Sequence, residues 1–369
     1  MKHPTRVLSS VLVLVACATA GAATAQTVTV IAQGLDNPRG LGFAPNGELY
    51  VAEAGSGGPG PCRASPEPGM PAICYGESGA LTRVDPLGLS PPVRVLRDLP
   101  SMAGPGGFAA SSGPVDVDFF GMTAFIAIGW GGDPALRAGL GGRSQLFGTI
   151  VRHVPAGGHR SIADISSNEV MYNPAGGPVD SNPYGILVLP GRRIVADAGA
   201  NVLIESLATD SLLPAHDRTL ALLPRTAVGA ESVPTSVIQG PDGYLYVGQL
   251  TGAPFFRGTA SVWRVPPQGG TPDLFAGGFS AIVDLAMDAA GTLYVVEIAS
   301  GFVPPPAGDG NPGVGNGRLL RKRPGEAPEV VLAGLVFPAG VAIGPEGALY
   351  LTNFGIFPGG GQVLRITLD

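Results

Sequence analysis

The sequence predicts an all-β fold, a six-bladed β-propeller, from three observations. The first is a pattern that recurs six times: a turn, an apolar strand, a glycine turn, and a second apolar strand that ends in a polar residue. The clearest copies span residues 35–53, 233–249, 282–297 and 337–353, and weaker copies span 113–129 and 182–197. A unit of this size cannot bury its apolar faces alone, so the copies must stack or close on one another.

The second observation is composition. Glycine (58) and proline (37) fall between the apolar strands, where they act as turn residues. Hydrophobic residues make up 45% of the chain and charged residues only 14%, which favours a large core. Helical periodicity is missing over any stretch of three turns, and only residues 135–140 are expected to form a short helical turn.

Two further strand types follow each copy in order. The second type is expected at residues 80–84, 148–152, 202–206, 261–265, 318–322 and 362–366. The third type is expected at residues 93–99, 160–165, 220–223, 272–277 and 329–335. Each of the first five copies therefore contributes four strands, which is the content of a propeller blade.

The third observation is that the sixth copy lacks its last strand. Residues 28–35 (VTVIAQGL) closely resemble residues 330–335 (VVLAGL), so the N-terminal strand is expected to complete the last blade and close the ring. Closure removes exposed strand edges. Residues 26–369 are thus interpreted as a single domain, with a parallel β-solenoid as the main alternative.

Residues 1–25 are predicted to be a signal peptide. Lys2 and Arg6 precede an apolar stretch at 7–20, and residues 23–25 (ATA) form a small-x-small cleavage site. The protein is therefore expected to be secreted or periplasmic. One alternative is a lipoprotein anchored at Cys17, because residues 14–17 (LVAC) resemble a lipobox; a transmembrane anchor is not expected, since the apolar run is short.

Cys62 and Cys74 lie in one loop rich in glycine and proline, GPGPCRASPEPGMPAICYG. A close pair of cysteines in an exported protein predicts a disulfide that pins the loop. Metal binding by two thiols is the alternative, but the loop offers no histidine or further cysteine.

The charge balance and motifs exclude several classes of function. A net charge of −6 and a pI near 5.3 give no electrostatic footprint for nucleic acid, and no basic run suggests an anionic membrane surface. The sequence contains no G-x-S-x-G elbow, P-loop or HExxH motif, and no dinucleotide-binding fingerprint in a strand–helix setting. His153, His159 and His216 are expected away from the axis of the ring.

Aligned positions supply the candidate site residues. One residue per copy ends what we expect to be the innermost strand and to point toward the central channel: Glu53, Gly129, Asp197, Gln249, Glu297 and Asn353. A second aligned position gives Gly40, Asp116, Gly185, Ser236, Asp284 and Gly340. Carboxylate and amide oxygens of this kind are calcium ligands. The alternative is that such side chains are polar only because a propeller channel holds water.

Long loops are the other candidates for binding, because long loops on a rigid scaffold often carry function. They span residues 62–74, 102–112, 129–142, 173–185 and 249–258. Trp130, Phe255 and Phe256 lie in these loops and are expected either to pack as loop cores or to contact a ligand.

Several of these stretches together resemble the ScyD/ScyE family of secreted proteins: NPRGLGFAPNGELYVAEAGSGG, GWGGDPALRAGLG, GGPVDSNPYGI, VPTSVIQGPDGYLYVGQLTGAPF and FPGGGQVLRI. The resemblance covers nearly the whole chain after residue 25 and implies a six-bladed propeller related to NHL and SMP-30-type propellers. It implies export and fold more than a reaction. The SMP-30-like gluconolactonases hold an axial divalent cation with Glu, Asn and Asp, and Glu53, Asn353 and Asp284 are similar in type.

We therefore expect an exported, non-catalytic, monomeric binding or scaffold module that takes a small molecule or a protein through its loop-bearing face and axial channel. One alternative is a calcium-dependent hydrolase with Glu53, Asp284 and Asn353 as metal ligands. Another is a lipid-anchored interaction protein. No cofactor other than calcium is expected.

Overall fold

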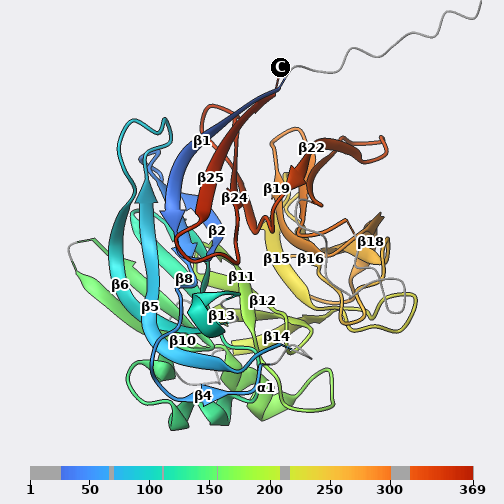
Figure 1. Ribbon diagram of the computed structural model, residues 1–369. Helices are drawn as coiled ribbons and strands as arrows, with labels where there is room; N and C mark the ends of the chain where they lie inside the picture. The colour runs from blue at the N-terminus through green and yellow to red at the C-terminus, as the bar shows by residue number, and fades with distance from the viewer. Residues whose placement is uncertain are drawn as a thin grey trace, which may run out of the picture.

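The computed structural model describes residues 26–65, 70–109, 112–155, 157–207, 217–300 and 316–368. The predicted signal peptide and Cys17 lie outside these residues, as does His216. Within them, six small antiparallel sheets form the blades of a β-propeller (Figure 1). The predicted fold class is confirmed.

The first three blades follow chain order from β2. The first blade contains β2 (Pro38–Phe43), β3 (Leu49–Glu53), β5 (Ile73–Val84) and β6 (Val93–Ala103), with β4 (Cys62–Arg63) added against β5. The second contains β7 (Gly113–Phe120), β8 (Thr123–Gly129), β9 (Thr149–Val154) and β10 (Gly158–Asp164). The third contains β11 (Pro183–Leu189), β12 (Arg192–Asp197), β13 (Val202–Leu207) and β14 (Asp217–Leu222).

The other three blades complete the circle. The fourth contains β15 (Pro234–Gln239), β16 (Leu245–Gln249), β17 (Ala260–Val265) and β18 (Asp273–Phe279). The fifth contains β19 (Ile282–Met287), β20 (Leu293–Glu297), β21 (Gly317–Lys322) and β22 (Glu329–Leu335). The sixth contains β23 (Gly340–Ile343), β24 (Leu349–Asn353), β25 (Gly361–Leu368) and β1 (Gln26–Leu35).

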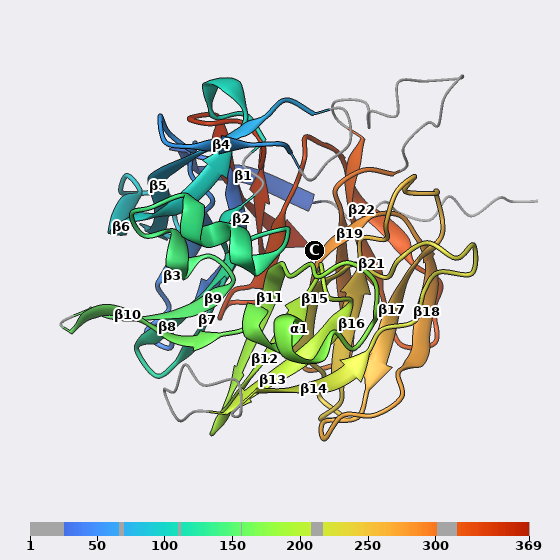
Figure 2. The same ribbon diagram turned by 90° about the horizontal axis from the view of Figure 1, so that it is seen from below.

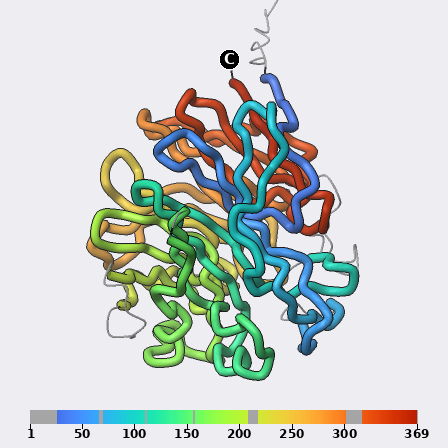
Figure 3. Tube along the Cα trace, turned by 90° about the vertical axis from the view of Figure 1, so that its left-hand side faces the viewer, coloured from blue at the N-terminus to red at the C-terminus, as the bar shows by residue number. Residues whose placement is uncertain are grey.

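The ring closes as predicted. β1 pairs antiparallel with β25 from Gln26 opposite Leu368 to Leu35 opposite Gly361. Figures 1 and 3 show these two ends of the chain lying side by side. The first strands of successive blades contact one another around the ring, and β23 meets β2 to complete the circle. Each first strand is therefore the innermost strand of its blade.

The repeat pattern reflects this layering. The second strand of a blade lies between the first and third strands and is covered on both faces by the neighbouring blades. Every residue of β3, β16, β20 and β24 is buried, which is why the LYV-type segments are the most apolar parts of the sequence. The turn between the first and second strands of each blade contains a glycine with positive φ, the conformation that favours glycine there. These are Gly47, Gly121, Gly191, Gly243, Gly291 and Gly347.

The long loops lie on one face of the ring. Strands in a blade alternate in direction, so the connections after second and fourth strands share one face and those after first and third strands share the other. The short glycine turns lie on the second face. The first face, here called the loop face, carries β4 and the single α-helix of the described residues, α1 (Ser166–Tyr172), at the lower end of Figure 1; Figure 2 views the molecule from this side.

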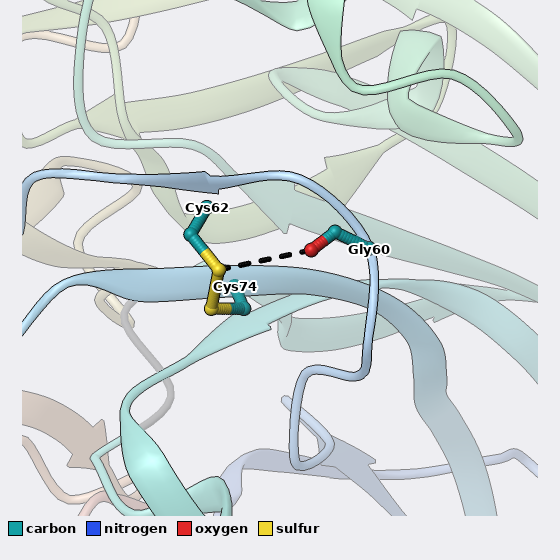
Figure 4. The surroundings of a disulfide bond; sticks show 3 residues. All are labelled: Gly60, Cys62 and Cys74. Carbon is teal, nitrogen blue, oxygen red and sulfur yellow. Dashed lines mark hydrogen bonds between the residues drawn. A yellow bond between two sulfur atoms is a disulfide. The ribbon is translucent and has the colours of Figure 1, made fainter.

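Three short 3₁₀ turns also lie on the loop face: η1 (Pro105–Gly107), η2 (Pro134–Gly139) and η3 (Ser144–Leu146). η2 confirms the helical turn expected near residues 135–140, whereas α1 is not predicted by the sequence pattern. The predicted disulfide is confirmed: Cys62 and Cys74 lie opposite each other on β4 and β5 and are bonded (Figure 4). Among the described residues, no helix has the length and apolar character needed to cross a membrane.

Candidate functional site

The six aligned strand-end residues, Glu53 to Asn353, do not lie on innermost strands as the sequence led us to expect. They end the second strand of each blade, one layer away from the axis. The reason is that the second strand is the most apolar strand of the repeat, and apolar character alone does not report its distance from the axis.

These residues are buried and hold the chain where it enters each blade. Three of them accept a hydrogen bond from the backbone amide seventeen residues earlier: Glu53 from Asp36 (2.6 Å), Glu297 from Ser280 (2.9 Å) and Asn353 from Val336 (2.8 Å). Asp197 accepts one from the amide of Asn182 (2.6 Å), and Gln249 donates to the hydroxyl of Ser232 (2.7 Å). The polar strand end is therefore a repeated structural device.

Two of the strand ends are also ion pairs. Arg94 on β6 donates from Nε to Glu53 Oε1 (2.9 Å) and from Nη2 to Glu53 Oε2 (2.7 Å). The same Nη2 contacts Asp36 at 2.9 Å. Arg318 on β21 pairs with Glu297 in the fifth blade. In both pairs the guanidinium donates to a buried acidic side chain and so offsets part of the cost of burying it.

Asp116 and Asp284 lie on innermost strands, in the second and fifth blades, which face each other across the ring. Asp116 accepts the amide of Ile186 in the third blade (2.9 Å), and Asp284 accepts the amide of Val341 in the sixth (2.8 Å). Burial, and then the charge of Asp284, raises the pKa of Asp116; burial raises the pKa of Asp284 to about 7. These carboxylates tie neighbouring blades together near the axis.

The three residues predicted to hold calcium do not share one setting. Glu53 is paired with Arg94, Asn353 accepts the amide of Val336, and Asp284 accepts backbone amides at the axis. Within the described ranges, no group of three or more His, Cys, Asp or Glu side chains is placed to hold a metal ion. Calcium binding by Glu53, Asp284 and Asn353 stays a prediction.

A pocket lies between the third and fourth blades. It has a volume of about 570 Å³. Its lining residues are Ala175, Gly176, Asn201, Leu222, Leu223, Pro224, Arg225, Glu231, Ser232, Gly270, Thr271 and Pro272. They come from the loop after α1, the turn between β12 and β13, the end of β14, the loop that joins the two blades, and the turn before β18. We call this opening the inter-blade pocket.

The equivalent groove between the sixth and first blades is much smaller, at about 210 Å³. It is lined by Gly34 and Leu35 from one blade and by Glu53, Thr82 and Arg94 from the other, with Pro92, Val93 and Arg97 at its edge. Both partners of the Glu53–Arg94 ion pair are among its lining residues. We call it the plugged groove, because an ion pair lies at this junction.

The inter-blade pocket is open for two reasons. The strand registers align Glu53 with Gln249 and Arg94 with Leu274, so the fourth blade has no ion pair at this position. Leu274 is instead 60% exposed and is not one of the residues that line the pocket. In addition, eleven residues separate β14 from β15, whereas two separate β1 from β2. The longer connection builds an extra wall.

Charges of both signs line the pocket. Arg225 Nη2 lies 3.5 Å from Glu231 Oε1, with side chains 63% and 55% exposed. A turn from Thr226 to Ala230 joins them, held by the amide of Ala230 donating to Thr226 Oγ1 (3.0 Å). Leu222, Leu223 and Pro272 are apolar residues of the same lining. The pocket can therefore bind a molecule that carries charged or hydroxyl groups together with an apolar part.

Sequence reasoning did not single out Arg225, Glu231 or Thr271. Two signals in the sequence could have pointed to them. One is the long interval between the last strand of the third blade and the first strand of the fourth. The other is Gln249, which stands where the first and fifth blades have Glu53 and Glu297. Of the residues it did single out, Trp130 is completely buried, packs against Phe147 and is covered by Arg63, so it forms a loop core.

Comparisons with known proteins support the fold. No protein-family model and no curated protein matches the sequence. A structural genomics protein of unknown function from Bacteroides thetaiotaomicron has a TM-score of 0.55 at 9% identity, over 94% of this chain and 76% of that one. Two glucose dehydrogenase structures have TM-scores of 0.52 and 0.51 at 14% and 13% identity, each covering 93% of this chain and 100% of the other. At such identities the likeness shows a six-bladed β-propeller and nothing about activity.

Proposed function

We propose that this protein is a binding propeller whose ligand site is the inter-blade pocket. The observation that carries the proposal is the opening itself: about 570 Å³ at a junction that an ion pair plugs elsewhere in the ring. That volume falls in the range of small-molecule sites, roughly 300–1,000 Å³. A departure from a repeat at one junction is a natural place for a specialised role.

The lining suggests the kind of ligand. Arg225 offers a planar fork of donors that suits a carboxylate, and Glu231 accepts from an amine or hydroxyl. Leu222, Leu223 and Pro272 would cover an apolar body. A small organic molecule with polar groups at one end, such as an amino acid derivative or an acidic sugar, fits this combination.

Export is part of the proposal. The disulfide between Cys62 and Cys74 supports an oxidising compartment, because disulfides rarely persist in the cytosol. An exported propeller with an open pocket would act on molecules outside the cytosol, as a binding module rather than as part of a cytosolic pathway.

The experiment is a thermal-shift screen of the purified protein against amino acids, short peptides, sugar acids and lactones. A ligand at a hundredfold excess over its dissociation constant stabilises the folded state by about 2.7 kcal/mol. Arg225→Ala and Glu231→Gln should abolish the shift for the best ligand. Both side chains are mostly exposed, so neither change should alter the melting temperature of the free protein by much.

The matched control is Arg97→Ala, which removes an arginine from the plugged groove between the sixth and first blades. It should leave binding intact. A ligand whose shift survives Arg225→Ala and Glu231→Gln, but disappears when the axial Asp284 is changed, would reject the inter-blade pocket in favour of an axial site.

A further inference from the structure

The wall of the inter-blade pocket includes a buried hydroxyl group, that of Ser232. This residue lines the pocket and is only 1% exposed. Its oxygen accepts a hydrogen bond from Gln249 Nε2 (2.7 Å) and, among the described residues, donates to no acceptor. A buried hydroxyl ordinarily uses both its donor and its acceptor capacity. The proton of Ser232 is therefore available to bind a ligand.

Gln249 fixes which way this hydrogen bond runs. The side chain is completely buried. Its Nε2 also donates to the carbonyl oxygen of Pro224 (2.9 Å), and its Oε1 accepts the backbone amide of Ser261 (3.2 Å). A carbonyl can only accept and a backbone amide can only donate, so the side-chain amide of Gln249 has one orientation. Its nitrogen faces Ser232, and the serine has to accept.

The third blade shows what happens when an acid stands at this position. Ser181 is the counterpart of Ser232, because each lies two residues before the proline that begins β11 or β15. Those prolines are paired with Asp197 and with Gln249. Ser181 Oγ donates to Asp197 Oδ2 (2.6 Å). A carboxylate thus takes up the serine proton in the third blade, whereas the amide of Gln249 leaves it available in the fourth.

The same glutamine holds the charged residues of the pocket next to Ser232. Its Nε2 contacts Pro224 and Ser232, at the two ends of the segment 224–232. Arg225 and Glu231 are the next residues inward from these ends. Arg225 Nη2 lies 3.5 Å from Glu231 Oε1. Groups that bind these two side chains therefore have to be neighbours on the ligand.

We infer that the pocket binds an α-amino or α-hydroxy acid by its carboxylate, with Ser232 Oγ and the Arg225 guanidinium as donors. Hydrogen bonds from such donors strengthen when the acceptor is charged. Glu231 would repel a lone carboxylate, so the adjacent ammonium or hydroxyl group of the ligand has to face it. Leu222 and Leu223 belong to the same lining and suit an apolar side group. This inference rests on the proposed function, since it concerns the ligand of the same pocket.

The role assigned to Ser232 is binding rather than catalysis. A nucleophilic serine is activated by a base that takes its proton. The group that contacts Ser232 Oγ is the amide nitrogen of Gln249, which donates and cannot take a proton. The serine is thus a hydrogen-bond donor to the ligand, and no covalent step is involved.

The test is calorimetric titration of the purified protein with leucine and with leucinamide, which lacks the carboxylate. Leucine should bind the unaltered protein at least about tenfold more tightly, the effect of hydrogen bonds to a charged group. Ser232→Ala should weaken leucine binding about tenfold and leucinamide binding much less, so the ratio of the two affinities falls. The matched control is Ser280→Ala, which removes the serine at the same position of the fifth blade, outside the lining, and should leave the ratio unchanged.

Gln249→Glu tests how the glutamine acts. Its carboxylate should take up the serine proton, as Asp197 does in the third blade, and lower the ratio to that of Ser232→Ala. In the Ser232→Ala background the same change should lower the ratio no further, because the two residues act as one unit. An equal fall in both backgrounds would mean that the added negative charge alone repels leucine, and would contradict the role given to Gln249.

The outcomes separate this inference from the proposed function. Suppose that a compound of the thermal-shift screen binds in the pocket, as judged by loss of its effect in Arg225→Ala, but carries no carboxylate. That result would overturn the inference and leave the proposed function standing. So would a ratio of leucine to leucinamide affinity that Ser232→Ala does not change. If no compound binds, or if binding survives both Arg225→Ala and Glu231→Gln, the proposed function fails and the inference fails with it.

Discussion

Glu53 is a completely buried carboxylate, and the residues around it explain how burial is tolerated. The Asp36 amide, the Thr82 hydroxyl and the Arg94 guanidinium all donate to its two oxygens. A buried ion pair adds little net stability, because desolvation offsets the attraction. Removing one partner is costly, since it leaves the other charge buried and unpaired.

Arg94→Ala should therefore destabilise the protein by about 3 kcal/mol, as judged by chemical denaturation. Arg97→Ala, its neighbour on the same strand, should change stability by less than about 0.5 kcal/mol. The double change Glu53→Gln with Arg94→Leu copies the residues of the fourth blade, Gln249 and Leu274, and should recover most of the loss. If the double variant is as unstable as Arg94→Ala, the unpaired charge is not the cause.

Asp116 and Asp284 predict a pH dependence. Both have a pKa above the ordinary value of 3.8, that of Asp284 reaching about 7. A raised folded-state pKa favours the folded protein while the group is protonated, so this stability is full below about pH 4 and is lost as pH rises toward 7. Asp197, with a pKa of about 6, acts in the same direction.

The melting temperature measured in EDTA should accordingly fall between about pH 5 and pH 8. Glu48, Glu205 and Glu346 have lowered pKa values and act the opposite way, but only where pH falls below about 4.5. Burial also lowers the pKa of His153 and of His159, and these two groups oppose the decline up to about pH 6.5. Asp284→Asn should flatten the decline. A melting temperature that rises steadily from pH 5 to pH 8 would contradict this account of the axial carboxylates.

At the scale of elements, one turn recurs between the first and second strands. Tyr50 donates to Glu48 (2.9 Å), Tyr246 to Asp242 (2.9 Å) and Tyr350 to Glu346 (2.5 Å). The acid sits in the turn and the tyrosine near the start of the next strand, so each pair closes its own hairpin. This explains why acid, glycine and tyrosine recur together in the GELY, DGYLY and EGALY segments.

The β4–β5 hairpin depends on the disulfide rather than on a repeat pattern. Beyond the Cys62–Cys74 and Arg63–Ile73 pairs, β4 has no further ladder. Changing both cysteines to serine should cost up to about 3 kcal/mol of stability in the chain-entropy model, measured by denaturant unfolding. The β-sheet circular dichroism should not change, because β5 still pairs with β3 and β6. Loss of the sheet signal would mean that the hairpin is needed to fold the first blade.

At the scale of the whole molecule, closure of the ring by β1 holds the first and last blades together. Ile31, Ala32 and Leu35 of β1 are buried, whereas Val28 and Val30 are 41% and 48% exposed. The strand contributes its buried residues to the same cluster as Leu41, Leu49 and Tyr350, from the first and sixth blades. It is thus a core element of both.

Deleting residues 26–35 should therefore expose the edge of β25 and abolish cooperative folding, with aggregation visible by size-exclusion chromatography. Deleting only residues 1–25 should give a folded protein with one sharp thermal transition. If the variant that lacks residues 26–35 still unfolds cooperatively at a similar temperature, ring closure is not what stabilises the propeller.

Much of this architecture could be predicted from the sequence, because the repeats carry the strand pattern, the turn glycines and the missing last strand. The layer of each strand could not, since Glu53 and Asn353 end apolar strands whose alternation does not report distance from the axis. The inter-blade pocket could not either. In the first blade this position holds the Glu53–Arg94 ion pair, whereas the fourth blade has Gln249 and Leu274 there and forms no ion pair. The difference is visible only once the strand registers align the two blades.

The most direct test of the account is hydrogen exchange of the protein with and without the strongest ligand from the thermal-shift screen. The account predicts slower exchange in peptides that cover residues 222–233 and 270–272, with no change in residues 34–35 and 92–97 of the plugged groove. Protection confined to the innermost strands around Asp116 and Asp284, or in the plugged groove alone, would contradict it.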